Sequence, residues 1–192
     1  TIWDKHIAQE NRQQQLHSAT VIKLFLNETY NREKAKLENE TARQLTVEER
    51  NYFAIGIAVA MMQKDGYTNK VSSEDLQQYI EKLWDKYPHE ALKPNDKKML
   101  KERLPKEEAL GIIQQAVRVG DILVADASEY AMFGFSHKSY MEYLVSVFYA
   151  NFVLKKDKDI QQQAITNAIT KAFNFKSTQL AHSFGNLHYK QG

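Results

Sequence analysis

The stretch from Tyr52 to Met62 constrains the fold of this chain more than any other feature, because it is apolar on every side. A helix without a polar face has no side to turn to water, so it has to be central and covered by other elements. Thr46 and Glu49 precede it with the spacing of a capping box, in which the threonine oxygen accepts a helix-start amide and the glutamate reaches back. The sequence therefore predicts a buried central helix from Thr46 to about Gln63.

The elements around this helix are expected to be helical as well. Seven glycines and three prolines among 192 residues are too few for the turns of an all-β protein, whereas good helix formers are common. Ser73 is expected to cap one helix, and Pro105 to open another at its first position. Apolar residues three and four apart, together with these signals, predict helices over about 2–36, 73–87, 94–103, 105–119, 136–154 and 159–173.

One stretch departs from the helical period. The segment 122–125 is aliphatic and β-branched, 126–129 has turn composition, and 130–135 alternates large residues around Gly134, which predicts a β-hairpin as the only sheet structure. Helices followed by a hairpin, over Val71 to Phe135, have the layout of a winged-helix domain. The predicted fold class is thus mainly α, a helical array with an embedded winged-helix element and one small β-hairpin.

Composition excludes several classes of function. There is no cysteine, so thiolate metal sites, disulfides and cysteine nucleophiles are ruled out, and an oxidising compartment is not indicated. The 26 basic and 24 acidic residues are mixed along the chain, which makes nucleic acid an unlikely partner. No apolar stretch reaches the roughly 20 residues that span a bilayer, and no signal peptide is evident, so we expect no membrane partner and a cytoplasmic location.

The passage with the most functional information follows the hairpin. It runs from Phe135 through His137 to a helix start whose sequence is Lys-Ser-Tyr-Met-Glu-Tyr-Leu. This passage resembles the end of the winged-helix domain in NACHT-type STAND NTPases, the nucleotide-switched signalling proteins that include NOD-like receptors and bacterial antiphage defence proteins. The matching positions are Phe135, His137, Ser139, Glu142, Tyr143 and Leu144. The chain departs from the family pattern at Tyr140, where phenylalanine is usual, and at Met141, where glutamine is usual.

The resemblance implies a role for one side chain in particular. In that family the motif histidine reaches from the winged-helix domain to the β-phosphate of ADP and holds the inactive state, and His137 occupies this position. A histidine at a helix start suits an anionic oxygen, because the imidazole N–H and the helix dipole both favour negative charge. The resemblance extends less specifically over Ser18 to Leu154, and implies that exchange of ADP for ATP releases the winged-helix domain.

Three segments follow from this interpretation. Residues 1–44 are expected to be a helical segment following an NTPase core, 45–154 a winged-helix-like regulatory domain, and 155–192 a C-terminal helix with an irregular tail. The chain contains no Gly-x-x-x-x-Gly-Lys-Ser/Thr, so we expect no cofactor in this part and place the nucleotide core, with ADP or with ATP and Mg, in sequence before Thr1. The expected partners are that upstream nucleotide-binding domain of the same protein and, on activation, further copies of the protein.

Other interpretations of the same residues remain open. Without the resemblance, His137 is a helix cap or a satisfied, partly buried histidine, and Glu142 bonds within its own domain. A free-standing winged-helix adaptor that binds protein or nucleic acid is the main alternative function. A hydrolase that uses His137 and Glu142 would need a nucleophile that the sequence does not reveal, so no catalytic residue is assigned. The other histidines lack the i, i+4 partners of a helical metal site, and none is predicted.

Overall fold

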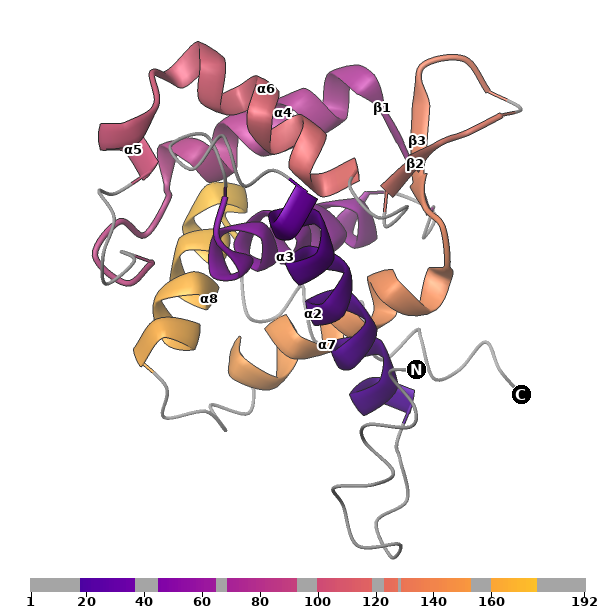
Figure 1. Cartoon of the computed structure of the whole chain (residues 1–192), viewed down its shortest axis with the longest axis horizontal. Coiled ribbons are helices and arrows are strands. Elements are labelled where there is room, and N and C mark those ends of the chain that lie inside the picture. Colours follow the sequence, from indigo (N-terminus) through magenta and orange to yellow (C-terminus); the bar gives the residue numbers. More distant parts are fainter. Residues whose placement is uncertain are drawn as a thin grey trace, which may run out of the picture.

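The fold is an array of helices with a small sheet at one end (Figure 1). The computed structural model describes residues 18–36, 45–64, 69–92, 100–118, 123–127, 129–152 and 160–175. The mainly helical class predicted from the sequence is confirmed. The helices within the described ranges are α2 (Ser18–Lys36), α3 (Val47–Gln63), α4 (Ser73–Asp85), α5 (Leu100–Arg103), α6 (Lys106–Arg118), α7 (Lys138–Phe152) and α8 (Ile160–Phe173).

Helix α3 lies at the centre of this array. Figure 1 shows α4 and α6 on one side of it and α7 on the other, and it contacts α2, α4, α6, α7 and α8. Every residue from Tyr52 to Met62 is buried, as predicted from its apolar surface. Gly56 lets α4 pack closely, because a Cβ atom at this position would overlap the side chain of Leu83. The apolar run thus supplies the core against which the other helices pack.

The sheet has three antiparallel strands in the order β1-β3-β2. Strands β2 (Leu123–Ala125) and β3 (Met132–Phe135) form the predicted hairpin. The prediction that this hairpin is the only sheet structure was wrong, because β1 (Lys70–Ser72) pairs with the other edge of β3, with Val71 opposite Phe133. A strand of three residues is too short to show a period of two, and its partner lies some sixty positions away, so local patterning does not reveal it.

Two helix starts differ by one residue from their predicted positions. The cap of α4 is Ser72 rather than Ser73, since the Ser72 Oγ accepts a hydrogen bond from the amide of Asp75 at 3.0 Å. Pro105 precedes the first helical residue of α6, and its carbonyl accepts the first helical hydrogen bond, from Ala109 at 2.9 Å. Adjacent serines offer the same side-chain chemistry, so only the backbone geometry decides which one caps.

Helices from all three predicted segments share one core. Leu26 and Tyr30 of α2, and Ile165 and Ile169 of α8, belong to the same buried cluster as α3. The predicted boundaries at 44/45 and 154/155 fall in stretches outside the described residues and stay predictions. Also outside the described residues are the predicted helix portions over 2–17 and 94–99, Ile122 of the hairpin and the irregular tail beyond 176. None of the described helices combines the length and the apolar run that crossing a bilayer requires.

Candidate functional site

The candidate site lies where strand β3 passes into helix α7. Phe135, the last residue of β3, is buried opposite Leu123, and its carbonyl accepts a hydrogen bond from the Asn69 side-chain amide at 2.8 Å. Residues 136–139 follow and are all exposed. The chain therefore leaves a fixed, buried strand end and reaches solvent within one residue.

Gly134 makes this strand end tight. It lies between Lys70 of β1 and Val124 of β2 in the sheet register. A Cβ atom at Gly134 would lie 2.7 Å from the backbone carbonyl oxygen of Asn69, closer than such contacts allow. The backbone just before β1 therefore comes too close for any side chain at this position. This contact explains why a glycine interrupts the large residues of the segment 130–135.

The imidazole of His137 is exposed and held from one side. The imidazole lies edge-on to the ring of Tyr140, with the centroids 5.2 Å apart. The backbone carbonyl of His137 accepts a hydrogen bond from the backbone amide of Tyr140 at 3.0 Å. Tyr140 in turn stacks on Phe25 of α2, with centroids 5.3 Å apart. Burial raises the pKa of the Tyr140 phenol above its ordinary value. The histidine therefore sits at the start of α7 with one ring edge packed and the rest open to a partner.

The other motif residues divide between packing and surface. Leu144 is buried in the core, and Tyr143 is half-buried, with its pKa raised by that burial. Ser139 is exposed. The carboxylate of Glu142 lies 3.4 Å from the ammonium of Lys138, one turn earlier on the same helix. Phe135 and Leu144 thus anchor the motif in the core, while the polar residues His137, Ser139 and Glu142 remain accessible.

This arrangement can bind an anionic oxygen. His137 and Lys138 bring an imidazole and an ammonium to the positive end of the α7 dipole, and the first turn of α7 contains no acidic residue. The amides of a first helical turn have no partner within the helix and point towards an approaching anion. In the described part of the chain, no group of three His, Asp or Glu side chains is placed to hold a metal ion.

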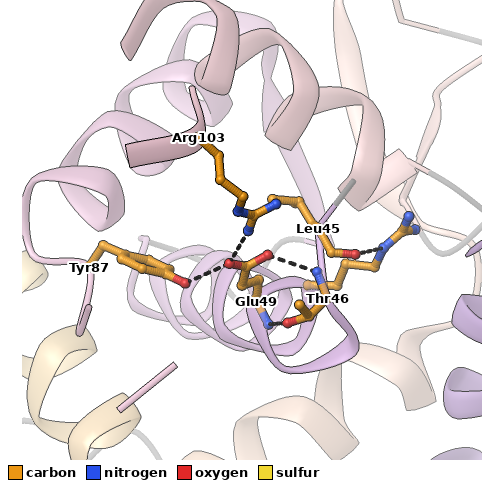
Figure 2. A network of polar contacts seen from close by, with 6 residues as sticks. Leu45, Thr46, Glu49, Tyr87 and Arg103 are labelled. Carbon is orange, nitrogen blue, oxygen red and sulfur yellow. Dashed lines mark hydrogen bonds and ion pairs between the residues drawn. The ribbon is translucent and has the colours of Figure 1, made fainter. Parts of the chain in front are cut away.

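A second polar cluster, which we call the Glu49 network, surrounds the start of α3 (Figure 2). The predicted capping box is confirmed, because the Glu49 carboxylate accepts from the Thr46 amide at 2.7 Å and the Thr46 hydroxyl accepts from the Glu49 amide at 3.1 Å. The same carboxylate accepts from the Tyr87 hydroxyl at 3.0 Å and pairs with the Arg103 guanidinium at 2.5 Å. Glu49 is fully buried and the Arg103 side chain is 5% exposed. This is a buried, multiply bonded ion pair.

The Glu49 network joins segments that are far apart in sequence. Figure 2 shows Tyr87 and Arg103 reaching the carboxylate from different sides. The pKa of the Tyr87 phenol is raised, first by burial and then by the negative charge of Glu49. Sequence reasoning found the local half of the network only, because Tyr87 and Arg103 lie 38 and 54 positions beyond Glu49.

No known protein family, curated protein or solved structure matches this chain. A functional proposal for this chain therefore rests on its residues, their geometry and the resemblance of the passage from Phe135 to Leu144 to the end of a NACHT-type winged-helix domain.

Proposed function

We propose that this chain is the regulatory, nucleotide-sensing part of a NACHT-type signalling NTPase, which holds the ADP-bound inactive state and transmits its release. In this proposal His137 contacts the β-phosphate of ADP held by the upstream nucleotide-binding domain of the same protein. The observation that carries it is the exposed imidazole at the open start of α7, directly after a buried strand end. ADP, or ATP with Mg, belongs to that upstream domain, and the protein acts in the cytoplasm.

The order of elements supports the winged-helix part of the proposal. Helix α3 is followed by β1, α4, the four-residue α5, α6, β2 and β3, and the three strands lie in the order β1-β3-β2. A winged-helix domain has helices followed by a hairpin that forms the wing, and here the wing would be β2 with β3. In this arrangement His137 lies directly beyond the wing, where a neighbouring domain can reach it.

A switch can follow from the contacts of this histidine. Its ring packs on Tyr140, and Tyr140 stacks on Phe25, so the position of α7 relative to α2 depends on the same aromatic group that holds the imidazole. When ATP replaces ADP, the contact between His137 and the phosphate changes. The inactive state is then no longer stabilised relative to the released state. Release of the regulatory part would then expose surfaces for assembly with further copies of the protein.

The test uses the intact protein, including its nucleotide-binding domain. His137→Ala is expected to lower the amount of ADP that copurifies and to raise basal signalling, because one charge-assisted hydrogen bond contributes about 1.5–3 kcal/mol, roughly tenfold or more in affinity. Lys171→Ala is the matched control, since it removes an exposed cation from the last turn of α8 and leaves the β3–α7 junction intact. Unchanged ADP content together with unchanged basal signalling in His137→Ala would contradict the proposal.

The alternative function is a free-standing winged-helix adaptor. The surface of α6, the helix that would read DNA in such a domain, favours a protein partner, because Glu107 and Glu108 occupy its first turn and Lys106 already pairs with Asp85 at 3.2 Å. Little positive charge is therefore left to neutralise phosphates. The reading frame upstream of Thr1 distinguishes the two functions, because a Walker motif followed by an acidic strand belongs only to the NTPase.

A further inference from the structure

A cavity of about 370 Å³ lies among α2, α3, α7 and α8. Its apolar lining includes Leu26, Ile55 and Val147. Small-molecule sites are typically concave, of about 300–1,000 Å³, with an apolar wall and a few placed polar groups. The polar lining of this cavity comes from all four helices and consists of Lys23, Asn27, Asn51, Tyr143, Asn151 and Gln162.

Four of these side chains are carboxamides, and their polar atoms are not used by the fold. The Oε1 atom of Gln162 is shut off from solvent and has no hydrogen-bond partner. Within the ranges that the structure describes, the side chains of Asn27, Asn51 and Asn151 also form no hydrogen bond to the protein. Asn27, Asn51 and Asn151 are half-buried, and asparagine is a poor helix former. Helix propensity therefore does not account for three asparagines and a glutamine around one cavity.

The chemistry of the lining defines what fits. Each carboxamide offers donors and an acceptor in one plane, which is how Asn and Gln pair with the edge of a nucleobase. The apolar wall suits the face of a flat ring. Among the described residues of the lining, Lys23 is the single charged group, and it calls for an acidic group on the ligand. We propose that this cavity binds a small anion with a planar, nucleobase-like ring, whose edge bonds to the carboxamides while its acidic group meets Lys23.

This site is separate from the candidate site at His137. The cavity is lined along α7 from Tyr143 to Asn151, whereas His137 precedes the first residue of that helix. The proposal is therefore independent of the assignment of the chain to a NACHT-type protein. A ligand held among α2, α3, α7 and α8 would bind the four helices together and would stabilise the chain by mass action.

The experiment measures binding of nucleoside 5′-monophosphates to the 192-residue chain by calorimetry, with AMP, GMP, CMP and UMP as probes and inorganic phosphate as a separate arm. At least one nucleotide is expected to bind with a Kd below 1 mM and to raise the Tm, whereas phosphate alone binds at least tenfold more weakly. Asn51→Leu is expected to weaken that nucleotide at least tenfold while leaving the Tm of the free chain equal or higher, because leucine fills the wall and favours the helix.

Two further variants complete the test. Lys23→Gln keeps a polar side chain at an exposed position of α2 and is expected to weaken the nucleotide at least fivefold, whereas His137→Ala leaves its affinity unchanged. The proposal is overturned if no nucleotide binds with a Kd below 1 mM, or if binding persists at full strength in both Asn51→Leu and Lys23→Gln. Loss of binding in His137→Ala alone would place the nucleotide at the β3–α7 junction and would equally overturn it. A negative result in the nucleotide titration says nothing about how much ADP copurifies with the intact His137→Ala protein. The two proposals are therefore tested by separate measurements.

Discussion

The starts of α3 and α7 show two opposite uses of a helix N-terminus. At α3 the chain supplies its own anion, because the buried carboxylate of Glu49 accepts from the Thr46 amide and pairs with Arg103. At α7 the first turn has no acidic side chain, and His137 and Lys138 present an imidazole and an ammonium in the open. The α3 start is thus occupied by a carboxylate of the chain itself, which stabilises the fold. The α7 start can accept an anion from a ligand or from another domain.

The two helix starts separate polar residues that stabilise the fold from polar residues that can bind a partner. Charges that are buried and mutually satisfied hold segments together, and removal of one partner alone is strongly destabilising. Charges that are exposed contribute little to stability. A side chain that is presented at an open helix start can therefore serve a partner at low cost to the fold. Substitutions at the two helix starts should differ in the same way, with large losses of stability at α3 and almost none at α7.

The largest effect is expected from Glu49→Leu. This change removes one partner of a buried ion pair and takes from the Arg103 guanidinium the carboxylate that it contacts at 2.5 Å, which costs about 3–5 kcal/mol. Urea unfolding of the 192-residue chain measures the loss. The matched control is Glu142→Leu at α7, where the carboxylate is 41% exposed and the expected change is about 0.5 kcal/mol or less. Equal losses in the two variants would contradict the distinction between the helix starts.

The double variant Glu49→Leu/Arg103→Met sharpens this result. Replacing both members of a buried pair by apolar residues also removes the buried guanidinium that has lost this carboxylate, so most of the stability should return. If the double variant is as unstable as Glu49→Leu alone, the loss comes from the hydrogen bonds to Thr46 and Tyr87 rather than from the ion pair.

A smaller loss is expected from Gly134→Ala, just before the α7 start. Its Cβ atom would lie 2.7 Å from a backbone oxygen that cannot rotate away, so overpacking should cost about 1–3 kcal/mol. Gly111→Ala is the control, because a Cβ atom on this α6 glycine meets nothing within 4 Å. That variant should gain about 0.5–1 kcal/mol from helix propensity. Thermal unfolding followed by circular dichroism distinguishes the two signs.

The start of α4 gives an intermediate case that depends on pH. Asp75 pairs with Lys64 and accepts from the Ser72 hydroxyl, and these bonds lower the pKa of its carboxyl. A lowered pKa stabilises the fold above the ordinary value of about 3.9, and this stabilisation is lost as the pH falls through the lower folded value. Asp75→Asn should therefore cost about 0.5 kcal/mol at pH 7 and nothing near pH 2. A difference in Tm that does not shrink below pH 4 would contradict this.

The smallest effect is expected from Lys138→Ala. It removes an exposed i, i+4 pair with Glu142, which contributes about 0.3–0.5 kcal/mol and less at high salt. Chemical unfolding in low and in 1 M salt should give differences from the parent chain that shrink towards zero. A loss above about 1 kcal/mol would mean that the α7 start is part of the structural core.

The features that sequence could predict are those encoded locally. The apolar run of α3, the capping box and the hairpin each depend on residues within a few positions of one another, and all three are confirmed. Strand β1, the Arg103 partner of Glu49 and the contact that requires Gly134 depend on residues far apart, which no local pattern reveals. At the candidate site the sequence indicated His137 through a resemblance, whereas its packing on Tyr140 and Phe25 required the structure.

The most direct test of the open α7 start is an NMR titration of the 192-residue chain with pyrophosphate at constant ionic strength. We expect saturable shifts of the amides of residues 137–140 and of the His137 ring, no saturable shift at residues 46–49, and loss of the α7 response in His137→Ala. Absence of a saturable shift at the α7 start, or a response that His137→Ala leaves intact, would show that this helix start binds no anion through His137.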